Sequence, residues 1–453
     1  MADELGLYIL TANCARNLID VDLFAAHLFD VLPAEAGSFG APALLVLSLQ
    51  EIAPIAYSFL GASYLTPYFD AFVKAVKKAT AKRWNESYVN LVRDHTGMTG
   101  LMVFVRADLS DNISWIDSAH VGFGLQEMGN KGAVGARLGY AVDKNQSKTV
   151  DLTFVAAHLA PMEDALEQRN LDWQSIVERL VFSQQDSLPK RLSEEGSNPD
   201  ERTALLRDRR SSSDHTQFPS RHDLFAPNTY LFLAGDLNYR TSDVSPSKAD
   251  LARFPRRSAS RDNPAHYSNL LKDDQLAREM HLGRSFHGLS EAPIDFPPTY
   301  KYSDAARKSA PLDHDSADGE WKWSSHRWPS WCDRILYLDS PAHTGSSGRV
   351  KPHVYDALPL LPQSDHRPVA LAVSVPLGPS SGPETDQPTG AKTVAPFAID
   401  PRWQARRDAA RRKEIVVGVL AYLGLTWEGN GLLLASTLGI VGAWVALQSV
   451  WGG

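Results

Sequence analysis

Carboxylate, amide and imidazole side chains recur directly after short apolar runs of this sequence. Asp236 and Asn238 follow the run Tyr230–Ala234, and His158 follows the run Leu152–Ala157. A carboxylate and an amide two residues apart at the end of a strand can orient a water molecule and bind an oxyanion. Read alone, however, both residues are also ordinary turn residues, so this pair by itself favours a turn.

A second acid and imidazole, Asp365 and His366, stand just before the apolar run Val369–Val375. Such a pair can move a proton within a cleft, although an isolated Asp-His is more often structural or exposed. Glu51 ends the run Ala43–Leu49. A carboxylate there can be a ligand of Mg²⁺, which takes oxygen donors and usually only one or two protein carboxylates. Read alone, a solvated loop acid is the simpler interpretation of Glu51.

Basic and aromatic side chains form further motifs. The loop Gly129–Gly132 contains one lysine and could hold a phosphate, and the segment Pro297–Tyr302 sets Lys301 between two phenols. Asp333 stands directly before the run Arg334–Leu338. The signal of each motif alone is weak or moderate, so their joint arrangement decides the interpretation.

The polar residues share one position, the end of a strand-like run. We therefore expect five of them to lie on one rim of a sheet core: Glu51, His158, Asp236, Asp333 and His366. This set is rich in oxygen donors and contains no cluster of thiolates, which favours Mg²⁺ over structural zinc.

The runs that position these residues are five to seven residues long and rich in Val, Ile, Leu or aromatic residues, which is typical of buried strands. They predict seven strands, over Leu5–Thr11, Ala43–Leu49, Leu101–Arg106, Leu152–Ala157, Tyr230–Ala234, Arg334–Leu338 and Val369–Val375. Apolar residues at helical spacing predict helices over Pro67–Ala79 and Met162–Gln184. The irregular alternation of strands and helices predicts a mixed α/β domain with a sandwich-like core.

The composition is that of a globular protein in a reducing compartment. Of 453 residues, 43% are hydrophobic and 22% charged, and the net charge of −7 gives no general reason to expect nucleic acid as a partner. Only Cys14 and Cys332 are present, which excludes a disulfide framework. A cysteine-dependent phosphatase needs an arginine six positions after its cysteine; here these positions hold Asp20 and Leu338, which excludes that chemistry.

Changes in composition divide the chain into four segments. We expect a catalytic domain over 1–376, a Pro-, Gly- and Ser-rich linker over 377–401, a basic segment over 402–414 and a hydrophobic anchor over 415–453. Within the domain, Ser187–Phe225 and Ser242–Pro264 lack periodicity and are predicted to be surface insertions.

The last segment has the length of a membrane span. Gly431–Trp451 runs 21 residues without a charge, and at ~1.5 Å per residue it spans roughly 30 Å, about the hydrocarbon core of a bilayer. The segment 402–413 carries six basic residues against one acid, and could touch anionic lipid heads on the cytosolic side. We expect a tail anchor in the endoplasmic reticulum membrane with a cytosolic domain, since the N-terminus lacks a secretory signal. A buried core helix is the alternative. Whether Ile415–Trp427 spans, pairs or lies on the surface stays open, because it is too short to span alone.

Five motifs together resemble one protein family. In chain order they are NKGAVGAR, GDLNYR, PPTYKY, PSWCDRIL and SDHRPV. Their combination is similar to the inositol polyphosphate 5-phosphatases, which belong to the DNase I-like metal-dependent phosphoesterases. The resemblance runs from about Gly6 to Val375 and implies a four-layer α/β/β/α sandwich, to which the chain adds a C-terminal transmembrane helix.

The resemblance implies roles for residues that match the motifs. Asn13 and Glu51 would hold Mg²⁺, and Asp236 would position or deprotonate the attacking water, with Asn238 beside it on the phosphate. Asp365 would lie beside the metal and the nucleophile. The motif before His158 departs from the family, because two alanines stand where a polar residue is often found.

The remaining roles concern the phosphate groups. The resemblance implies that His366 contacts the scissile phosphate and assists proton transfer, that Asp333 orients its ring, and that His158 hydrogen-bonds the 5-phosphate. The neighbours that grip phosphates, in particular the 4-phosphate, would be Lys131, Tyr300, Lys301 and Arg334.

The resemblance implies Mg²⁺-dependent removal of the 5-phosphate from phosphoinositides by direct attack of water. The expected reaction converts phosphatidylinositol 4,5-bisphosphate to phosphatidylinositol 4-phosphate, with the 3,4,5-trisphosphate lipid and soluble inositol phosphates as further candidates. Two other functions remain open: a phosphodiesterase of the same fold, such as a nuclease or sphingomyelinase, and a non-enzymatic tail-anchored adaptor. The sequence predicts no oligomeric state.

Overall fold

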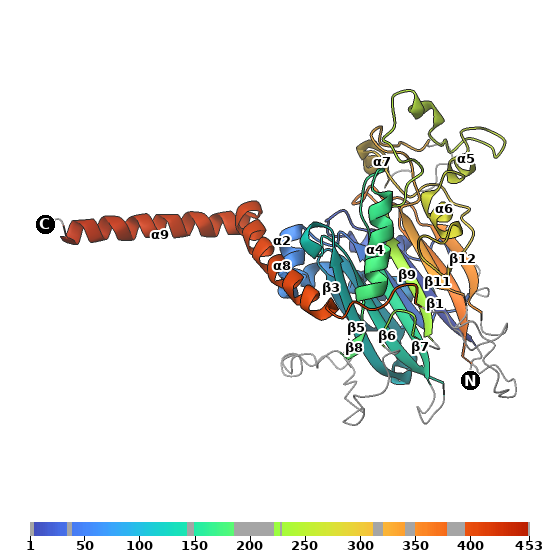
Figure 1. Cartoon of the computed structure of the whole chain (residues 1–453), viewed down its shortest axis with the longest axis horizontal. Coiled ribbons are helices and arrows are strands. Elements are labelled where there is room, and N and C mark those ends of the chain that lie inside the picture. The colour runs from blue at the N-terminus through green and yellow to red at the C-terminus, as the bar shows by residue number, and fades with distance from the viewer. Residues whose placement is uncertain are drawn as a thin grey trace.

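Two β-sheets stacked face to face form the body of the molecule (Figure 1). The computed structural model describes residues 4–33, 39–142, 149–184, 222–226, 229–310, 320–339, 349–377 and 395–451. The first sheet has six strands in the order β12-β13-β1-β2-β4-β3. Their bounds are β1 (Glu4–Asn13), β2 (Leu44–Gln50), β3 (Tyr88–Thr96), β4 (Thr99–Arg106), β12 (Lys351–Ala357) and β13 (Val369–Pro376).

The second sheet has seven strands in the order β10-β11-β9-β7-β6-β5-β8. Their bounds are β5 (Ile113–Phe123), β6 (Lys131–Ala141), β7 (Thr149–His158), β8 (Ser183–Gln184), β9 (Thr229–Asp236), β10 (Leu289–Glu291) and β11 (Asp333–Leu338). All seven predicted strands are therefore confirmed, three in the first sheet's centre (β1, β2, β13), β4 beside them, and β7, β9 and β11 in the second sheet.

Alternation of side chains along these strands separates three apolar layers. Inward-facing residues such as Val46 and Phe154 fill the space between the sheets. Outward-facing residues of the first sheet pack under α1 (Val21–His27) and α3 (Thr66–Trp84). Those of the second sheet pack under α4 (Leu166–Arg179). Because each face of each strand must be covered, the result is the predicted four-layer α/β/β/α sandwich.

The helices differ from prediction in length and number. The predicted helix Pro67–Ala79 lies inside α3, whereas the helix predicted over Met162–Gln184 is shorter, since α4 ends at Arg179. Further short helices are α2 (Ile55–Leu60), α5 (Tyr267–Leu271), α6 (Gln275–His281) and α7 (Asp304–Ser309). Among the described residues, 3-10 helices cover Ala62–Tyr64, Ala107–Asn112, Leu125–Glu127 and Asp250–Arg253.

The predicted insertions have different outcomes. Most of Ser187–Phe225 and of the linker 377–401 lies outside the described residues. The segment 242–264 is described and is mostly exposed, but its Phe254 is buried against Trp328, with ring centroids 5.5 Å apart. This second insertion is therefore fastened to the core, and the Trp323 indole adds a hydrogen bond of 2.7 Å to the carbonyl of its Pro255.

The C-terminal region forms two consecutive helices, α8 (Trp403–Leu425) and α9 (Trp427–Trp451). The basic segment and the first apolar segment thus share one helix, and no change of structure occurs at residue 414. α8 packs against α2 of the sandwich, whereas α9 projects away from it (Figure 1). Among the described residues, α9 is the single helix long and apolar enough to cross a membrane, and its apolar window is 0% buried.

Candidate active site

Three neighbouring strands of the second sheet end in a row of polar side chains. In the strand register, His158 of β7 lies opposite Asp236 of β9, and Asp236 lies opposite Asp333 of β11. Each continues the inward-facing series of its strand, because residues two and four positions away belong to the core between the sheets. The row therefore lies at the mouth of the inter-sheet space.

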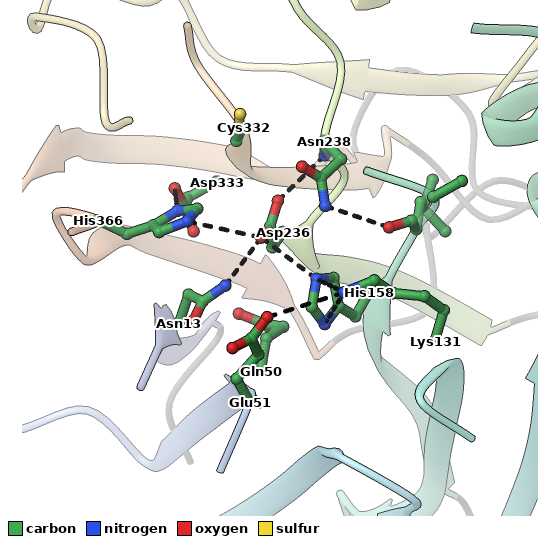
Figure 2. A network of polar contacts seen from close by, with 12 residues as sticks. Asn13, Gln50, Glu51, Lys131, His158, Asp236, Asn238, Cys332, Asp333 and His366 are labelled. Carbon is green, nitrogen blue, oxygen red and sulfur yellow. Dashed lines mark hydrogen bonds and ion pairs between the residues drawn. The ribbon is translucent and has the colours of Figure 1, made fainter. Parts of the chain in front are cut away.

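The first sheet supplies the other wall of this mouth. Asn13 and Gln50 end β1 and β2 as paired neighbours, and Asn13 Nδ2 donates a hydrogen bond to Asp236 Oδ2 at 2.9 Å. Glu51 then leaves the strand with φ +48°, which turns its side chain to the same mouth (Figure 2). Ser364 Oγ donates to the Asn13 carbonyl at 2.6 Å and so holds the loop before β13 against the site.

His366 lies between two carboxylates. Its Nδ1 is 2.8 Å from Asp333 Oδ2, and its Nε2 is 3.9 Å from Asp236 Oδ2 (Figure 2). Thr299 Oγ1 donates to the same Asp333 oxygen at 2.7 Å. Burial alone would lower the pKa of His366, but Asp333 and Asp236 raise this pKa to about 9. The imidazole is therefore a cation at neutral pH, with its orientation fixed by Asp333.

Asp236 is the most densely contacted carboxylate of the site. Burial would raise the pKa of Asp236, but His366, His158 and Lys131 together hold this pKa well below its ordinary range. His158 Nε2 is 3.4 Å from Asp236 Oδ2, and Lys131 Nζ is 2.7 Å from the same His158 nitrogen. Burial, with Lys131 beside it, lowers the pKa of His158. Asp236 is thus ionised in a pocket of positive and neutral hydrogen-bond donors.

Two sets of residues could hold a metal ion. The ligand atoms of Asp236, Asp333 and His366 lie within 4.8 Å of one another. However, a protonated His366 has no free lone pair to coordinate a metal, so this trio is a poor set of metal ligands. Glu51 offers a carboxylate with only loose ion pairs, at 3.2 Å to Arg16 and 3.8 Å to Lys131. Asn13 turns its amide nitrogen to Asp236, and its Oδ1, which accepts from the Ala15 amide at 2.9 Å, would face a metal after the side-chain amide rotates. This oxygen set fits a hard divalent cation.

The other predicted residues lie around the cluster at different distances. The rings of Tyr300 and His366 pack with centroids 4.5 Å apart. Lys301 and Asp365 form an ion pair with each other. Asn238 does not continue the strand as expected, because its φ of +58° breaks the alternation; its backbone N–H donates to Asp236 Oδ1 at 3.1 Å instead.

The prediction that Arg334 grips a phosphate is wrong for this structure. Successive side chains of a strand point to opposite faces, so Arg334 points away from the site that holds Asp333. Its guanidinium is buried and bonded to Asp274 at 3.0 Å and to Glu291 at 2.5 Å and 2.6 Å. These pairs leave Arg334 no access to substrate.

Arg240 is a residue that sequence reasoning missed. It ends the motif GDLNYR, is 2% exposed, and lies over the Tyr300 ring with its Cζ 4.5 Å from the centroid. It also bonds the side chain of Asn238. The available signal was its place at the end of this motif, four residues after Asp236; its burial, which requires a specific partner, is visible only in the structure.

The two cysteines take no part in this chemistry. Both thiols are buried, and burial raises the pKa of Cys14 and of Cys332 well above the ordinary value. A thiol with a raised pKa is a poor nucleophile near neutral pH. The exclusion of a cysteine-dependent phosphatase therefore agrees with the geometry.

Comparison with known proteins identifies the family. The family model described as Endonuclease/Exonuclease/phosphatase family 2 matches residues 10–372. Type II inositol polyphosphate 5-phosphatase 15 of Arabidopsis thaliana is 34% identical over 293 residues, which cover 61% of this chain and 23% of that protein. Polyphosphatidylinositol phosphatase INP53 of Saccharomyces cerevisiae is 27% identical over 333 residues, 73% of this chain and 23% of that protein. The chain thus matches about a quarter of the length of these curated relatives.

A solved structure supports the architecture. The inositol polyphosphate 5-phosphatase domain of a synaptojanin, in complex with inositol (1,4)-bisphosphate and calcium ion, superimposes with a TM-score of 0.55 at 21% identity, covering 91% of this chain and 92% of that one. At this identity the likeness establishes the fold. The family model over residues 10–372 shows that the chain belongs to the endonuclease/exonuclease/phosphatase family 2, and the curated relatives confirm its predicted relationship to the inositol polyphosphate 5-phosphatases.

Proposed function

We propose that this protein hydrolyses the 5-phosphate of phosphoinositides with Mg²⁺ as cofactor, and that it converts phosphatidylinositol 4,5-bisphosphate to phosphatidylinositol 4-phosphate. The observation that most strongly supports this proposal is the ionised Asp236, which is bonded to Asn13 and faced by His366, His158 and Lys131. The relatives support the substrate class through their names, and the synaptojanin ligand, a 1,4-bisphosphate, is what remains when a 1,4,5-trisphosphate loses its 5-phosphate.

In the proposed reaction, water attacks phosphorus in line with the bond to the inositol oxygen. Asp236 accepts a hydrogen bond from this water and receives its proton, while the bond between phosphorus and the 5-oxygen breaks. The leaving oxygen takes a proton, which the cationic His366 is placed to supply. Mg²⁺ held by Glu51 and Asn13 would neutralise charge on the phosphate oxygens.

The cationic side chains around this point account for phosphate binding. Lys131 lies beside His158, and burial lowers the pKa of Lys131 while Glu51 and Asp236 oppose that change. Lys301 Nζ and Arg240 Cζ lie 5.2 Å and 4.5 Å from the ring centroid of Tyr300. We assign the neighbouring 4-phosphate to Lys301, because a second phosphate needs its own cation, whereas Arg240 is buried and holds Asn238.

We also propose that α9 anchors the enzyme in a membrane, with the endoplasmic reticulum as the expected host. Its length and apolar surface support the anchor. Arg412 and Lys413 of α8 are exposed and could meet anionic lipid heads. Beside them, Val416 and Leu420 are 59% and 63% exposed, as expected for a helix face that contacts lipid.

A substrate panel tests the proposed function. The full chain in detergent is given the 4,5-bisphosphate lipid, the 3,4,5-trisphosphate lipid, inositol 1,4,5-trisphosphate, sphingomyelin and duplex DNA, with and without Mg²⁺. We expect Mg²⁺-dependent phosphate release from the inositol compounds. DNA nicking or sphingomyelin cleavage would instead establish the phosphodiesterase alternative, and no reaction at all would establish the adaptor.

Variants then test the assigned residues. Asp236→Ala and His366→Ala should each lower kcat by about 10³-fold or more, because each removes a group that acts in the transition state. Asp262→Ala, which truncates an exposed aspartate away from the row, is the matched control. Near-normal turnover in either site variant would overturn the assignment.

A further inference from the structure

The helix that leads to the proposed anchor is docked on the catalytic sandwich. Ala410, Glu414 and Gly418 of α8 are buried, and their spacing of four residues places them on one helix face. This face meets α2, the strand β5 and the loop before β6. The basic segment was expected to be a tether beside the membrane, but part of its charge is used for this contact.

Two arginines, Arg406 before the docking face and Arg411 within it, hold α8 against the sandwich. Arg406 bonds Glu127 and is 2.7 Å from Asp400, and Glu127 also pairs with Arg179 of α4 at 3.1 Å. One turn later, Arg411 Nη1 donates to the Phe59 carbonyl at 2.8 Å, at the C-terminal end of α2. A cation at the C-terminal end of a helix satisfies a carbonyl that has no partner within the helix, and it interacts favourably with the helix dipole.

Close approach of the helices depends on a glycine. A Cβ at Gly418 would lie 3.0 Å from Phe59 Cβ and 3.2 Å from the Leu60 amide nitrogen. A larger side chain must therefore push α8 away from α2. A Cβ at Gly424, six residues later on the same helix, would meet nothing within 4 Å, so this position provides a matched comparison.

Glu414 connects this docking face to the active site. Its Oε1 accepts a hydrogen bond from the Gly129 amide at 2.8 Å in a buried contact. Gly129 begins the loop that carries Lys131, and its carbonyl accepts from the Met98 amide at 2.9 Å. The Met98 carbonyl in turn accepts from the Ile52 amide at 3.2 Å, directly after Glu51. One chain of hydrogen bonds therefore joins Glu414 to the two segments that carry Lys131 and Glu51.

We propose that Glu414 is a positioning residue, and that docking of α8 holds Lys131 and Glu51 in the geometry that binds the substrate phosphate. The inference rests on the proposed function of the site. Its consequence is that the helix between sandwich and anchor acts on catalysis itself, apart from bringing the enzyme to its lipid. Loss of docking then weakens binding of a soluble substrate as well.

The test uses the full chain in detergent with Mg²⁺ and soluble inositol 1,4,5-trisphosphate, so that membrane recruitment contributes nothing. We expect Glu414→Ala and Gly418→Leu to raise KM about tenfold with kcat within about threefold, since misplacing a phosphate-binding lysine removes ground-state binding. Glu414→Gln should recover most of this loss, because its amide oxygen can still accept from Gly129. The control Gly424→Leu should leave both constants within about twofold of the wild type.

Hydrogen exchange gives a readout independent of activity. Exchange at the amides of Met98 and Ile52, which lie beyond Glu414 in the chain of hydrogen bonds, should quicken about tenfold in Glu414→Ala and stay unchanged in Gly424→Leu. Unchanged KM and exchange in both docking variants would overturn the proposal and leave α8 a passive tether. If Gly418→Leu fails to fold, the comparison of Glu414→Ala with Glu414→Gln still tests the proposal. If the wild type releases no phosphate, the proposed function fails, and exchange alone decides the coupling.

Discussion

His366 owes its charge to Asp333, which bonds its Nδ1, and to Asp236, which faces its Nε2. The carboxylates raise the pKa of this imidazole to about 9. A raised pKa means that the protonated form, and the stability it gives, is fully present below the ordinary value and is lost as the pH rises through about 9. Activity that needs the cation should fall over the same alkaline range.

Asp333→Asn should therefore move the alkaline limb of the kcat profile to lower pH, because the neutral amide no longer stabilises the imidazolium. We expect a shift of about one pH unit or more. The measurement is kcat against pH with soluble substrate, and the substitution is its own steric control because the amide keeps the shape of the carboxylate. An unchanged limb would show that His366 is not the titrating group.

Arg334 offers a prediction of the opposite kind. Arg334→Met should lower the free energy of unfolding by about 3–5 kcal/mol, because it leaves the buried Asp274 and the half-buried Glu291 without their cation. The enzyme that remains folded should keep its KM. Urea unfolding and steady-state kinetics check the two halves, and a raised KM with unchanged stability would return Arg334 to the phosphate site.

The sequence was informative about the residues of the row and uninformative about their neighbours. Asp236, Asp333 and His158 could be placed because each adjoins an apolar run and the period of two then sets its face. The same two-residue alternation along β11 places Arg334 on the face opposite Asp333. The motif alone does not show this. Arg240 lies beyond the strand, where the chain turns at Asn238 and periodicity no longer applies.

At the scale of elements, the register of β7, β9 and β11 brings the row together. Gly235 permits the close contact of β9 with β7, since a Cβ there would lie 1.9 Å from the Ala157 carbonyl oxygen. The neighbouring strand would have to move, and His158 would move with it.

Gly235→Ala should lower both stability and turnover. We expect about 1–3 kcal/mol less unfolding free energy, as for overpacking of a filled core, and a reduced kcat because His158 and Asp236 separate. Gly40→Ala, where a Cβ meets nothing within 4 Å, is the comparison. Thermal melts and kinetics of the two variants give the answer; an active, stable Gly235→Ala would mean that the strands can adjust without loss.

Strands with a continuous apolar run could be predicted from the sequence, whereas strands with polar residues could not. The central strands were found from their composition, whereas β3, at the edge of the first sheet, has polar residues such as the half-buried Asn90 and the exposed Arg93 that dilute its pattern. Composition changes at residue 414, but the helix α8 continues through it. The docking of α8 on the sandwich could not be predicted, because no local pattern encodes these contacts.

At the scale of the whole molecule, α8 and α9 should be separable in their effects. A chain ending at Leu425 removes α9, whose apolar span is unburied, and should lose stable membrane association while keeping the KM for soluble inositol trisphosphate. A chain ending at Pro401 also loses α8 and should show the raised KM. Liposome flotation and kinetics on the two truncations check this, and flotation of the shorter chains would show that α9 is not the anchor.

A single residue, Thr426, separates the docked helix α8 from α9. With α9 in a membrane, as proposed, free movement between the sandwich and the bilayer would be confined to this joint, since α8 packs on the sandwich. An enzyme held so closely would reach lipids of the leaflet in which it is embedded and would be unable to span the gap to an apposed organelle. Its working range would be set by the angle of one joint, and its substrate would have to arrive by lateral diffusion.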